Sequence, residues 1–340
     1  MRLRSLATAV ATLSAVVALA PTASAAPTYR PADAAAGWLA RQMADGDHFE
    51  VDFGGTLYPD AGLTIDAILA FASAKTANGH GAAALTWLAQ PATLNGYIGS
   101  GGEAYAGATA KAALAAQVRG ANPASFGGVD LIARLNTLLT PSGRFSDQSA
   151  FGDYSNAFTQ SLAVIVLDRT AAGAPASAVD FTANAQCPDG GYPISYGVTP
   201  CASDTDATAM VAQALIATGR HTDANEALNW LRSKQQSGGG LAFGDGSGAP
   251  NTNTTGLAGQ AFRAGGKLVP ATKAGLYVLS LRVTCAGAAD QRGAIAYDAT
   301  GFDQSTAPRA TAQAILGLPG TPLATLTSAG SSADADTLAC

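Results

Sequence analysis

A repeat of about 48 residues constrains this 340-residue chain more than any other feature of its sequence. Each unit opens on an aromatic or leucine residue, and a glycine and a second aromatic residue follow it. The opening positions are Trp38, Trp87, Leu135, Phe181, Trp230 and Tyr277. The steps between them are 49, 48, 46, 49 and 47 residues. Five steps so nearly equal indicate six copies of one structural unit.

A second short motif recurs once in each unit and places a polar side chain among small and aliphatic residues. It reads TIDAIL, TAKAAL, FTQSLA, VAQALI, AGQAFR and TAQAIL, with the polar residue at Asp66, Lys111, Gln160, Gln213, Gln260 and Gln313. Both motifs have helical patterns, and loops rich in Gly and Asp separate them. We therefore expect two helices per unit and an all-α fold of about twelve helices.

Capping side chains predict where the second helix of a unit begins. Seven residues before the aligned polar position, the last four units carry Asp153, Asp206, Asn253 and Thr306. These side chains accept hydrogen bonds from the free N–H groups of a first helical turn. Pro308 falls two residues after Thr306, in the first turn, where its missing N–H costs nothing.

Composition supports closely packed helices. Ala contributes 77 residues and Gly 39, whereas charged residues make up only 13%. This composition excludes a disordered chain, a coiled coil and a disulfide-dense small protein. A body of about 300 residues exceeds most single cores unless it is built from repeats.

The N-terminus has the pattern of an export signal. Arg2 and Arg4 precede an apolar run at residues 6–20, and Ala23-Ser24-Ala25 offers small residues for cleavage. We predict a signal peptide at residues 1–25, a repeat domain at 26–318, a flexible tail at 319–340, and secretion.

Charge and hydropathy exclude some partners. Without residues 1–25 the net charge changes from -5 to -7, because two Arg and no acidic residue are removed. An acidic surface of low charge density does not fit nucleic acid or an anionic membrane. No later segment reaches the roughly 20 apolar residues of a spanning helix, so no integral membrane segment is expected.

The repeat resembles a known family. Trp230-Leu-Arg-Ser-Lys-Gln235, with the glycines and Phe243 that follow, resembles the Gln-Trp repeat of squalene/terpenoid cyclases and protein prenyltransferases. Residues 203–210 and Gln213-Ala-Leu215 resemble the inner helix of that repeat, although the closing Trp is Phe or Tyr in every unit here. Over residues 34–318 the resemblance implies an α/α toroid with six inner and six outer helices around a central cavity. Secreted vitamin B12 carriers and complement-type domains share this toroid, so it does not select a function.

The resemblance also implies a candidate acid. Protonation-initiated cyclases carry Asp-x-Asp-Asp-Thr-Ala at the start of an inner helix, which would make Asp206 the proton donor and Asp204 its supporting carboxylate. The last Asp of that motif is Ala207 here. The alternative, which we favour, is that Asp206 caps its helix, as Asn253 and Thr306 would in their units.

No metal or cofactor is predicted. None of His48, His80 and His221 lies at ligand spacing from a cysteine, so the zinc of prenyltransferases has no ligand set here. The acidic stretch 45–52 lacks the Gly and Glu of an EF-hand and is interpreted as a solvated loop. The glycine-rich run 237–248 lacks the Lys of a phosphate-binding loop.

The four cysteines predict disulfides in an exported chain. Cys187 and Cys201 are 14 residues apart in one loop and can meet locally. Pairing Cys285 with Cys340 would tie the tail to the last unit, although Cys340 could also stay free or pair between chains. Three connectivities are possible, and we favour 187–201 with 285–340.

A row of glutamines supplies candidate ligand contacts. Gln160, Gln213, Gln260 and Gln313 recur once per unit, so they are expected at equivalent heights around the ring. They could line the cavity and bind a ligand, or satisfy backbone groups of a neighbouring loop, which repetition in every unit favours. Asp153, Tyr154 and Asn253 complete the set of candidate ligand-binding residues.

Three functions remain open. A cyclase needs Asp206 as an acid and a cavity lined with aromatic rings, which stabilise carbocations. A carbohydrate-active enzyme needs carboxylates facing each other, for which Asp153, Asp206 and Asp303 would have to converge. Aromatic residues are only 7% of the chain, and most close the repeats. We therefore favour a secreted, non-catalytic module that binds an unknown small molecule or an extracellular protein.

Overall fold

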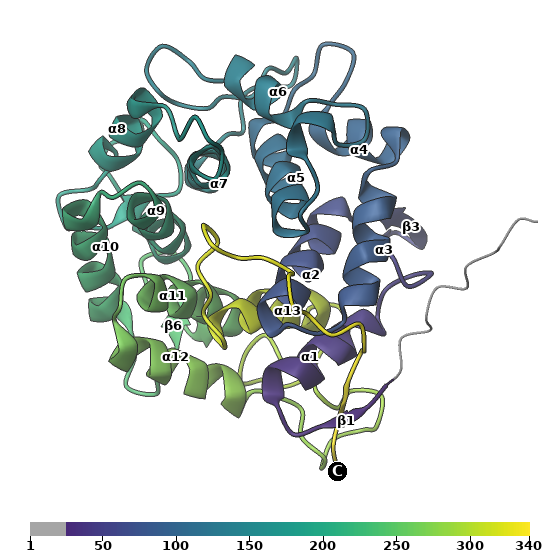
Figure 1. Ribbon diagram of the computed structural model, residues 1–340. Coiled ribbons are helices and arrows are strands. Elements are labelled where there is room, and N and C mark those ends of the chain that lie inside the picture. Colours follow the sequence, from purple (N-terminus) through teal and green to yellow (C-terminus); the bar gives the residue numbers. More distant parts are fainter. Residues whose placement is uncertain (1–24) are drawn as a thin grey trace, which may run out of the picture.

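Six helices form a closed inner ring, and the remaining helices surround it (Figure 1). The computed structural model describes residues 25–340, so the predicted signal peptide lies outside the described residues except for Ala25. The inner helices are α2 (Ala61–Ala74), α5 (Ala106–Val118), α7 (Ala157–Asp168), α9 (Thr205–Ala217), α11 (Thr252–Ala264) and α13 (Ala307–Gly317). The polar residue of every repeat motif lies on one of them. The all-α, six-repeat α/α toroid is therefore confirmed.

The outer ring is less regular than the inner one. Its helices are α1 (Pro31–Ala40), α3 (Asn78–Leu88), α4 (Pro91–Ile98), α6 (Leu131–Thr137), α8 (Ala176–Asn184), α10 (His221–Lys234) and α12 (Leu268–Ser280). One unit contributes both α3 and α4, which gives thirteen α-helices within residues 25–340 rather than twelve. Trp38 and Trp230 lie on outer helices, are 1% and 6% exposed, and each donates its indole N–H to an acceptor in a loop.

Small residues bring the inner helices together. A Cβ atom on Gly256 of α11 would lie 2.6 Å from the Gln313 carbonyl oxygen of α13, and one on Gly317 would lie 2.7 Å from the Gly256 carbonyl oxygen. A larger residue at either position would push the two backbones apart. The abundance of Ala and Gly is therefore a requirement of the ring.

Short strands and bridges hold the loops that lead into the inner helices. The pairs are β2 (Glu50–Phe53) with β3 (Thr56–Pro59), β4 (Tyr192–Pro193) with β5 (Ser203–Asp204), and β6 (Leu241–Ala242) with β7 (Pro250–Asn251). A 3-10 helix (Pro123–Ser125) precedes α6. The first amide of an inner helix donates to the next unit's loop, as Thr205 does to the Gly244 carbonyl at 2.8 Å and Thr252 to the Tyr297 carbonyl at 2.8 Å. These loops form one end of the ring, which we call the N-terminal mouth.

The predicted capping positions are wrong in three of four units. The N-caps of α9 and α11 are Asp204 and Asn251, whose side chains accept from the amides of Ala207 and Thr254. Both caps end a strand, β5 or β7, and the strand gives them the extended backbone that an N-cap needs. Asp206 and Asn253 lie two residues later, inside the first turn. The prediction that Asp206 is the N-cap of its helix is therefore wrong, and Asp204 is the cap.

The other two predicted caps also differ from the structure. Asn156, and not Asp153, caps α7 by accepting from the amides of Phe158 and Thr159. Thr306 does occupy the N-cap of α13, but its side chain makes no capping hydrogen bond.

Residues 319–340 are ordered, which corrects the expectation of a flexible tail. The segment crosses the end of the ring opposite the mouth (Figure 1), and Leu326 in it is fully buried. Arg169, at the C-terminus of α7, donates to the carbonyls of Leu323 at 2.6 Å and Leu326 at 2.9 Å. Gln260 of α11 donates to the Thr321 carbonyl at 2.7 Å. We call residues 319–327 the floor of the ring.

After the floor, the chain returns to the first unit. Residues 332–334 bond to the backbone after α2, and β8 (Thr337–Leu338) pairs in parallel with β1 (Pro27–Thr28). Disulfides join Cys187 to Cys201 and Cys285 to Cys340, as predicted. No helix within residues 25–340 has the length and apolar character to cross a membrane.

Candidate functional site

The inner helices present two layers of residues toward the ring interior. Residues four apart share a helix face, so each helix contributes one residue near the mouth and one a turn deeper. The mouth layer is Gly62, Gly107, Phe158, Asp206, Asn253 and Arg309. The deeper layer is Asp66, Lys111, Leu162, Met210, Leu257 and Gln313, and all six line one central cavity.

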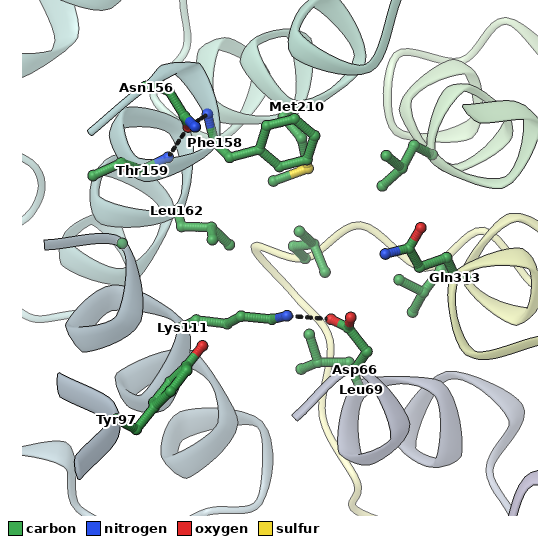
Figure 2. A pocket seen from close by; sticks show the side chains of 14 residues that line it. Asp66, Leu69, Tyr97, Lys111, Asn156, Phe158, Thr159, Leu162, Met210 and Gln313 are labelled. Atoms are coloured by element: carbon green, nitrogen blue, oxygen red, sulfur yellow. Dashed lines mark hydrogen bonds and ion pairs between the residues drawn. The ribbon is translucent and has the colours of Figure 1, made fainter. Parts of the chain in front are cut away.

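The cavity has a volume of about 280 Å³ and lies between the mouth and the floor. Leu69 and Leu316 line its lower part, and Leu323 of the tail contributes from below. Tyr97 reaches it from outer helix α4, and Phe158 from the mouth layer (Figure 2). Residues from all six inner helices and from the tail therefore line one space.

The two halves of the cavity differ in character. Helices α7, α9 and α11 contribute Phe158, Leu162, Met210 and Leu257, which we call the apolar wall. Helices α2, α4, α5 and α13 contribute Asp66, Tyr97, Lys111 and Gln313, which we call the polar wall. Figure 2 shows Lys111 and Asp66 pointing toward each other from neighbouring helices.

The charges of the polar wall are paired. The Lys111 ammonium lies 2.6 Å from Oδ1 of Asp66 and donates to the Gly62 carbonyl at 2.9 Å. Arg309 places Nη1 at 3.5 Å from Oδ2 of Asp66 and Nη2 at 2.7 Å from Oδ2 of Asp60. Burial by itself lowers the pKa of Lys111, but its interactions with Asp66 and Tyr97 together outweigh burial and the pKa is raised, so this amine stays charged.

Two polar groups of this wall have no protein partner within residues 25–340. The Tyr97 hydroxyl makes no hydrogen bond there, and burial raises the pKa of Tyr97, which keeps the hydroxyl protonated. The side-chain amide of Gln313 also faces the cavity without a partner (Figure 2). Both groups are therefore available to a ligand.

Asp204 and Asp206, the candidate catalytic pair, differ in their surroundings. Asp204 is 5% exposed and caps α9 through the Ala207 amide at 2.7 Å; burial raises its pKa. Asp206 lies one turn above Met210, at the mouth of the apolar wall, and burial raises its pKa to about 6. The hydroxyl of Thr254 counteracts that shift, whereas the Asp204 carboxylate adds to it. Among the described residues, Oδ1 of Asp206 is buried without a hydrogen-bond partner.

Asn253 occupies the same position on the neighbouring helix. Its side-chain oxygen is also buried without a partner within the described chain. Asp206 and Asn253 are thus two polar side chains of the mouth layer with unused hydrogen-bonding capacity. Neither of them lines the central cavity.

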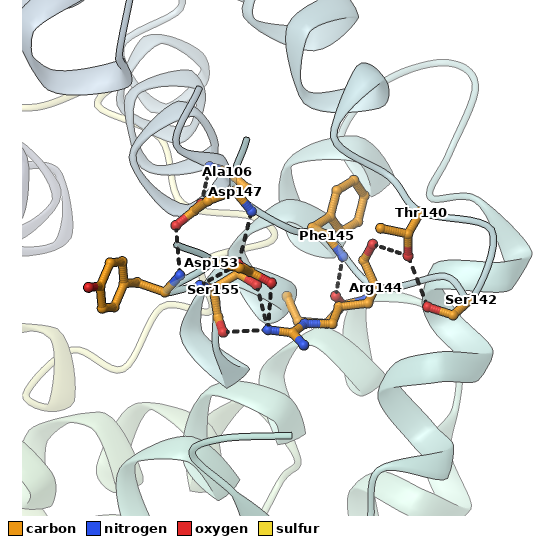
Figure 3. A network of polar contacts seen from close by, with 10 residues as sticks. Ala106, Thr140, Ser142, Arg144, Phe145, Asp147, Asp153 and Ser155 are labelled. Atoms are coloured by element: carbon orange, nitrogen blue, oxygen red, sulfur yellow. Dashed lines mark hydrogen bonds and ion pairs between the residues drawn. The ribbon is translucent and has the colours of Figure 1, made fainter. Parts of the chain in front are cut away.

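Asp153 and Tyr154 lie outside the cavity, in the loop before α7. Asp153 pairs with Arg144 at 2.9 Å and accepts from the Asp147 amide at 3.0 Å (Figure 3). Burial raises the pKa of Asp153, but hydrogen bonds from Ser155 and Asp147 lower it by more, so the pKa is lowered. Tyr154 is 75% exposed. This network fixes the loop against α5, because Asp147 also accepts from the first amide of that helix at 2.8 Å.

The carboxylates required for a carbohydrate-active site do not converge on the cavity. Asp153 is held by Arg144, and Asp303 accepts from the amides of Ser305 and Thr306 in its own loop. Neither Asp153, Asp206 nor Asp303 lines the cavity, and Asp66, which does, is paired with two cations.

The four glutamines occupy three different environments. Gln160 satisfies loop backbone groups, accepting from the Phe145 amide at 2.9 Å and donating to the Gly143 carbonyl at 3.0 Å. Gln213 and Gln260 bond to each other at 3.2 Å and hold the floor. Gln313 lines the cavity. The expected equivalence holds only for Gln213 and Gln260.

Several cavity residues were not proposed from the sequence. Asp66 and Lys111 occupy the same repeat column as the glutamines, and their opposite charges in adjacent units were the signal that could have identified them. Tyr97 and Leu323, which line the cavity, carry no such signal because they lie outside the inner helices. Arg309, which pairs with Asp66 above the cavity, carries none because it precedes the repeat motif of α13.

Comparison with known proteins gives the fold. No family model and no curated protein matches the amino-acid sequence. The solved structure of the type II terpene cyclase MstE from Scytonema is similar with a TM-score of 0.61 and 15% identity, over 85% of this chain and 96% of that one. The structure of protein geranylgeranyltransferase-I of Candida albicans, complexed with GGPP, is similar with a TM-score of 0.54 and 13% identity, over 78% of this chain and 88% of that one. The structure of a UGL variant with dGlcA-Glc-Rha-Glc is similar with a TM-score of 0.56 and 10% identity, over 85% of this chain and 96% of that one.

These likenesses match the resemblance seen in the sequence. The chain has the α/α-toroid fold that terpenoid cyclases and protein prenyltransferases share. At 10–15% identity the shared property is the fold, and the chemistry of the site has to be argued from its own residues.

Proposed function

We propose that this protein is a secreted binding protein whose central cavity holds one small, largely apolar molecule. The observation that carries the proposal is the central cavity of about 280 Å³ with an apolar wall on one half and a paired polar wall on the other. Ligand sites are typically concave and mostly apolar, with a few polar groups that orient the ligand. The predicted signal peptide and the two disulfides support an extracellular location.

The apolar wall would contribute to the affinity for such a ligand. Leu162 and Leu257 line the cavity and are 8% and 7% exposed. An apolar ligand would remove their remaining exposed surface from water, and its binding would then stabilise the folded state.

Native mass spectrometry with a panel of small apolar compounds tests the proposal. Wild-type protein should retain a compound in a one-to-one complex, and Leu257→Phe, which fills the cavity, should lose it. The matched control is Leu276→Phe, the same change on the 61% exposed side of outer helix α12. Retention by the Leu257→Phe variant at the wild-type level would contradict the central cavity as the binding site.

A second function is supported by Asp206. Its buried, unpartnered carboxyl oxygen and raised pKa fit a proton donor placed above the apolar wall, as in a terpenoid-cyclase-like enzyme. Cyclised products from linear isoprenoids that disappear in Asp206→Asn, but persist in Asp153→Asn, would establish this activity. Binding is favoured over this activity, because Asp206 does not line the central cavity.

A further inference from the structure

The polar wall narrows the kind of molecule that the cavity can hold. We infer, building on the proposed function, that the ligand is an uncharged, mostly hydrocarbon molecule that carries one oxygen, such as an alcohol or a ketone. Three features support this inference: the apolar wall of the cavity, the pairing of its charges and its free hydrogen-bond donors.

The apolar wall and the floor favour a hydrocarbon ligand. Phe158, Met210 and Leu257 line one half of the cavity. The floor closes the end of the ring opposite the mouth, because Leu323 is 3% exposed and its segment is held by Arg169 and Gln260.

Pairing of the charges excludes a charged head group. Lys111 and Arg309 face Asp66 and Asp60 at 2.6 to 3.5 Å, so two cations are matched by two carboxylates. A ligand carboxylate at the remaining N–H of Lys111 would bring a third negative charge beside Asp66 and Asp60, whose charges Lys111 and Arg309 already balance. A ligand ammonium would likewise add a third positive charge beside Lys111 and Arg309. Burying an unpaired charge is strongly unfavourable, so an uncharged ligand is preferred.

Free donors select an oxygen atom on the ligand. An ammonium has three N–H donors, and Asp66 and Gly62 take two from Lys111. The Tyr97 hydroxyl and the amide of Gln313 add donors on the same wall (Figure 2). A hydroxyl or carbonyl oxygen accepts from such groups without any change in charge. Its hydrocarbon part then lies against Phe158, Met210 and Leu257.

Methionine methyl groups give a probe inside the cavity. Residues 26–340 contain Met43 and Met210, and only Met210 lines this cavity. In the mature protein labelled with [13C-methyl]methionine, the Met210 signal is titrated at pH 8 with octan-1-ol, octanoate and octylamine. These three ligands have the same chain and differ in head-group charge. Met43 serves as the internal reference.

The expected result is a saturable shift of Met210 with octan-1-ol, and dissociation constants at least about tenfold higher for octanoate and octylamine. If octanoate or octylamine binds as tightly as the alcohol, the inference about the head group is overturned while the binding function stands. If none of the three moves Met210, both the inference and the proposed function lose their basis.

Two variants test the cause of the selectivity. Asp66→Asn removes the carboxylate that neutralises Lys111, so octanoate should gain at least about tenfold relative to octan-1-ol. Asp153→Asn, the same change outside the cavity, should leave the order of ligands unaltered. Tyr97→Phe with Gln313→Leu should weaken octan-1-ol severalfold, and unchanged affinity in that double variant would overturn the placement of the oxygen. Should Asp66→Asn fail to fold, the order of the three ligands on the wild-type protein decides the question.

Discussion

The two walls of the cavity stand on equivalent positions of equivalent helices, yet they are built in opposite ways. On the apolar wall, Leu162, Met210 and Leu257 face the space with nothing to pair. On the polar wall, the same layer carries Asp66 and Lys111, which face each other at 2.6 Å. The comparison teaches that the position along an inner helix fixes which residue faces the cavity, whereas the chemistry of that residue is free to vary from unit to unit.

The largest effect is expected from breaking the polar wall. Lys111→Met should lower the free energy of unfolding by about 3–5 kcal/mol, because it removes the nearest counter-charge of a carboxylate that is 8% exposed. Combining it with Asp66→Leu should recover most of that loss and make the two walls alike. Guanidinium unfolding of the three proteins measures both changes. A double variant no more stable than Lys111→Met would show that the pair does not act as a unit.

Truncation in the apolar wall should cost less. Leu257→Ala is expected to lose about 2 kcal/mol, at the low end for buried leucine, because part of its surface already faces the cavity. The control is Leu114→Ala on α5, a fully buried leucine that does not line the cavity, with an expected loss of about 4 kcal/mol. Equal losses measured by urea unfolding would mean that the cavity side of Leu257 is packed.

The mouth layer also differs between the two halves of the ring, since Arg309 lies above the polar wall and Asp206 lies above the apolar wall. Because burial raises the folded-state pKa of Asp206 to about 6, the folded protein binds a proton more readily than the unfolded chain does. This group therefore makes the protein lose stability as the pH rises from about 4 to about 6, by on the order of 1–2 kcal/mol. In Asp206→Asn that part of the pH dependence should disappear, and thermal unfolding between pH 4 and pH 7 checks it. A variant with the wild-type pH profile would assign the titration to other groups.

The smallest expected effect separates two glutamines that the sequence presents as equivalent. Gln260→Ala removes a 2.7 Å hydrogen bond to the floor and should cost about 1 kcal/mol. Gln313→Ala removes an amide without a protein partner in the described chain and should be close to neutral. Melting temperatures of the two variants compare them directly. A larger loss for Gln313→Ala would assign that amide a structural role.

The sequence predicts the ring well because the ring depends on periodic features. Trp and Gln positions recur at nearly constant steps, and each marks one helix face. The first residues of the helices are harder to predict from the sequence, since Asp204 and Asp206 are both good capping residues. Asp204 is the cap because its strand pairing with Tyr192 holds it in an extended conformation. A capping side chain is chosen by local backbone geometry, and spacing along the chain does not report it.

The site and the tail depend on contacts between distant residues. Asp66 pairs with Arg309, 243 positions away, and Tyr97 enters from an outer helix. The tail has the Ser, Ala and Asp composition of a flexible segment, yet side chains of three inner helices or their ends bind its backbone, namely Arg169, Gln213 and Gln260. Its order is specified by the ring and not by its own residues.

The returning tail has a consequence for the order of assembly. Residues 335 and 336 accept from Arg41, and the Asp336 carbonyl lies so close to α1 that a Cβ atom on Gly37 would be 1.7 Å from it. The ribosome adds residues 335 and 336 only after all six units. Helix α1 therefore cannot form its contacts with them until synthesis has passed residue 336. Contacts between such distant residues form slowly. The emergence of this last segment, and not the emergence of each repeat, therefore sets the earliest moment at which the floor can close the ring.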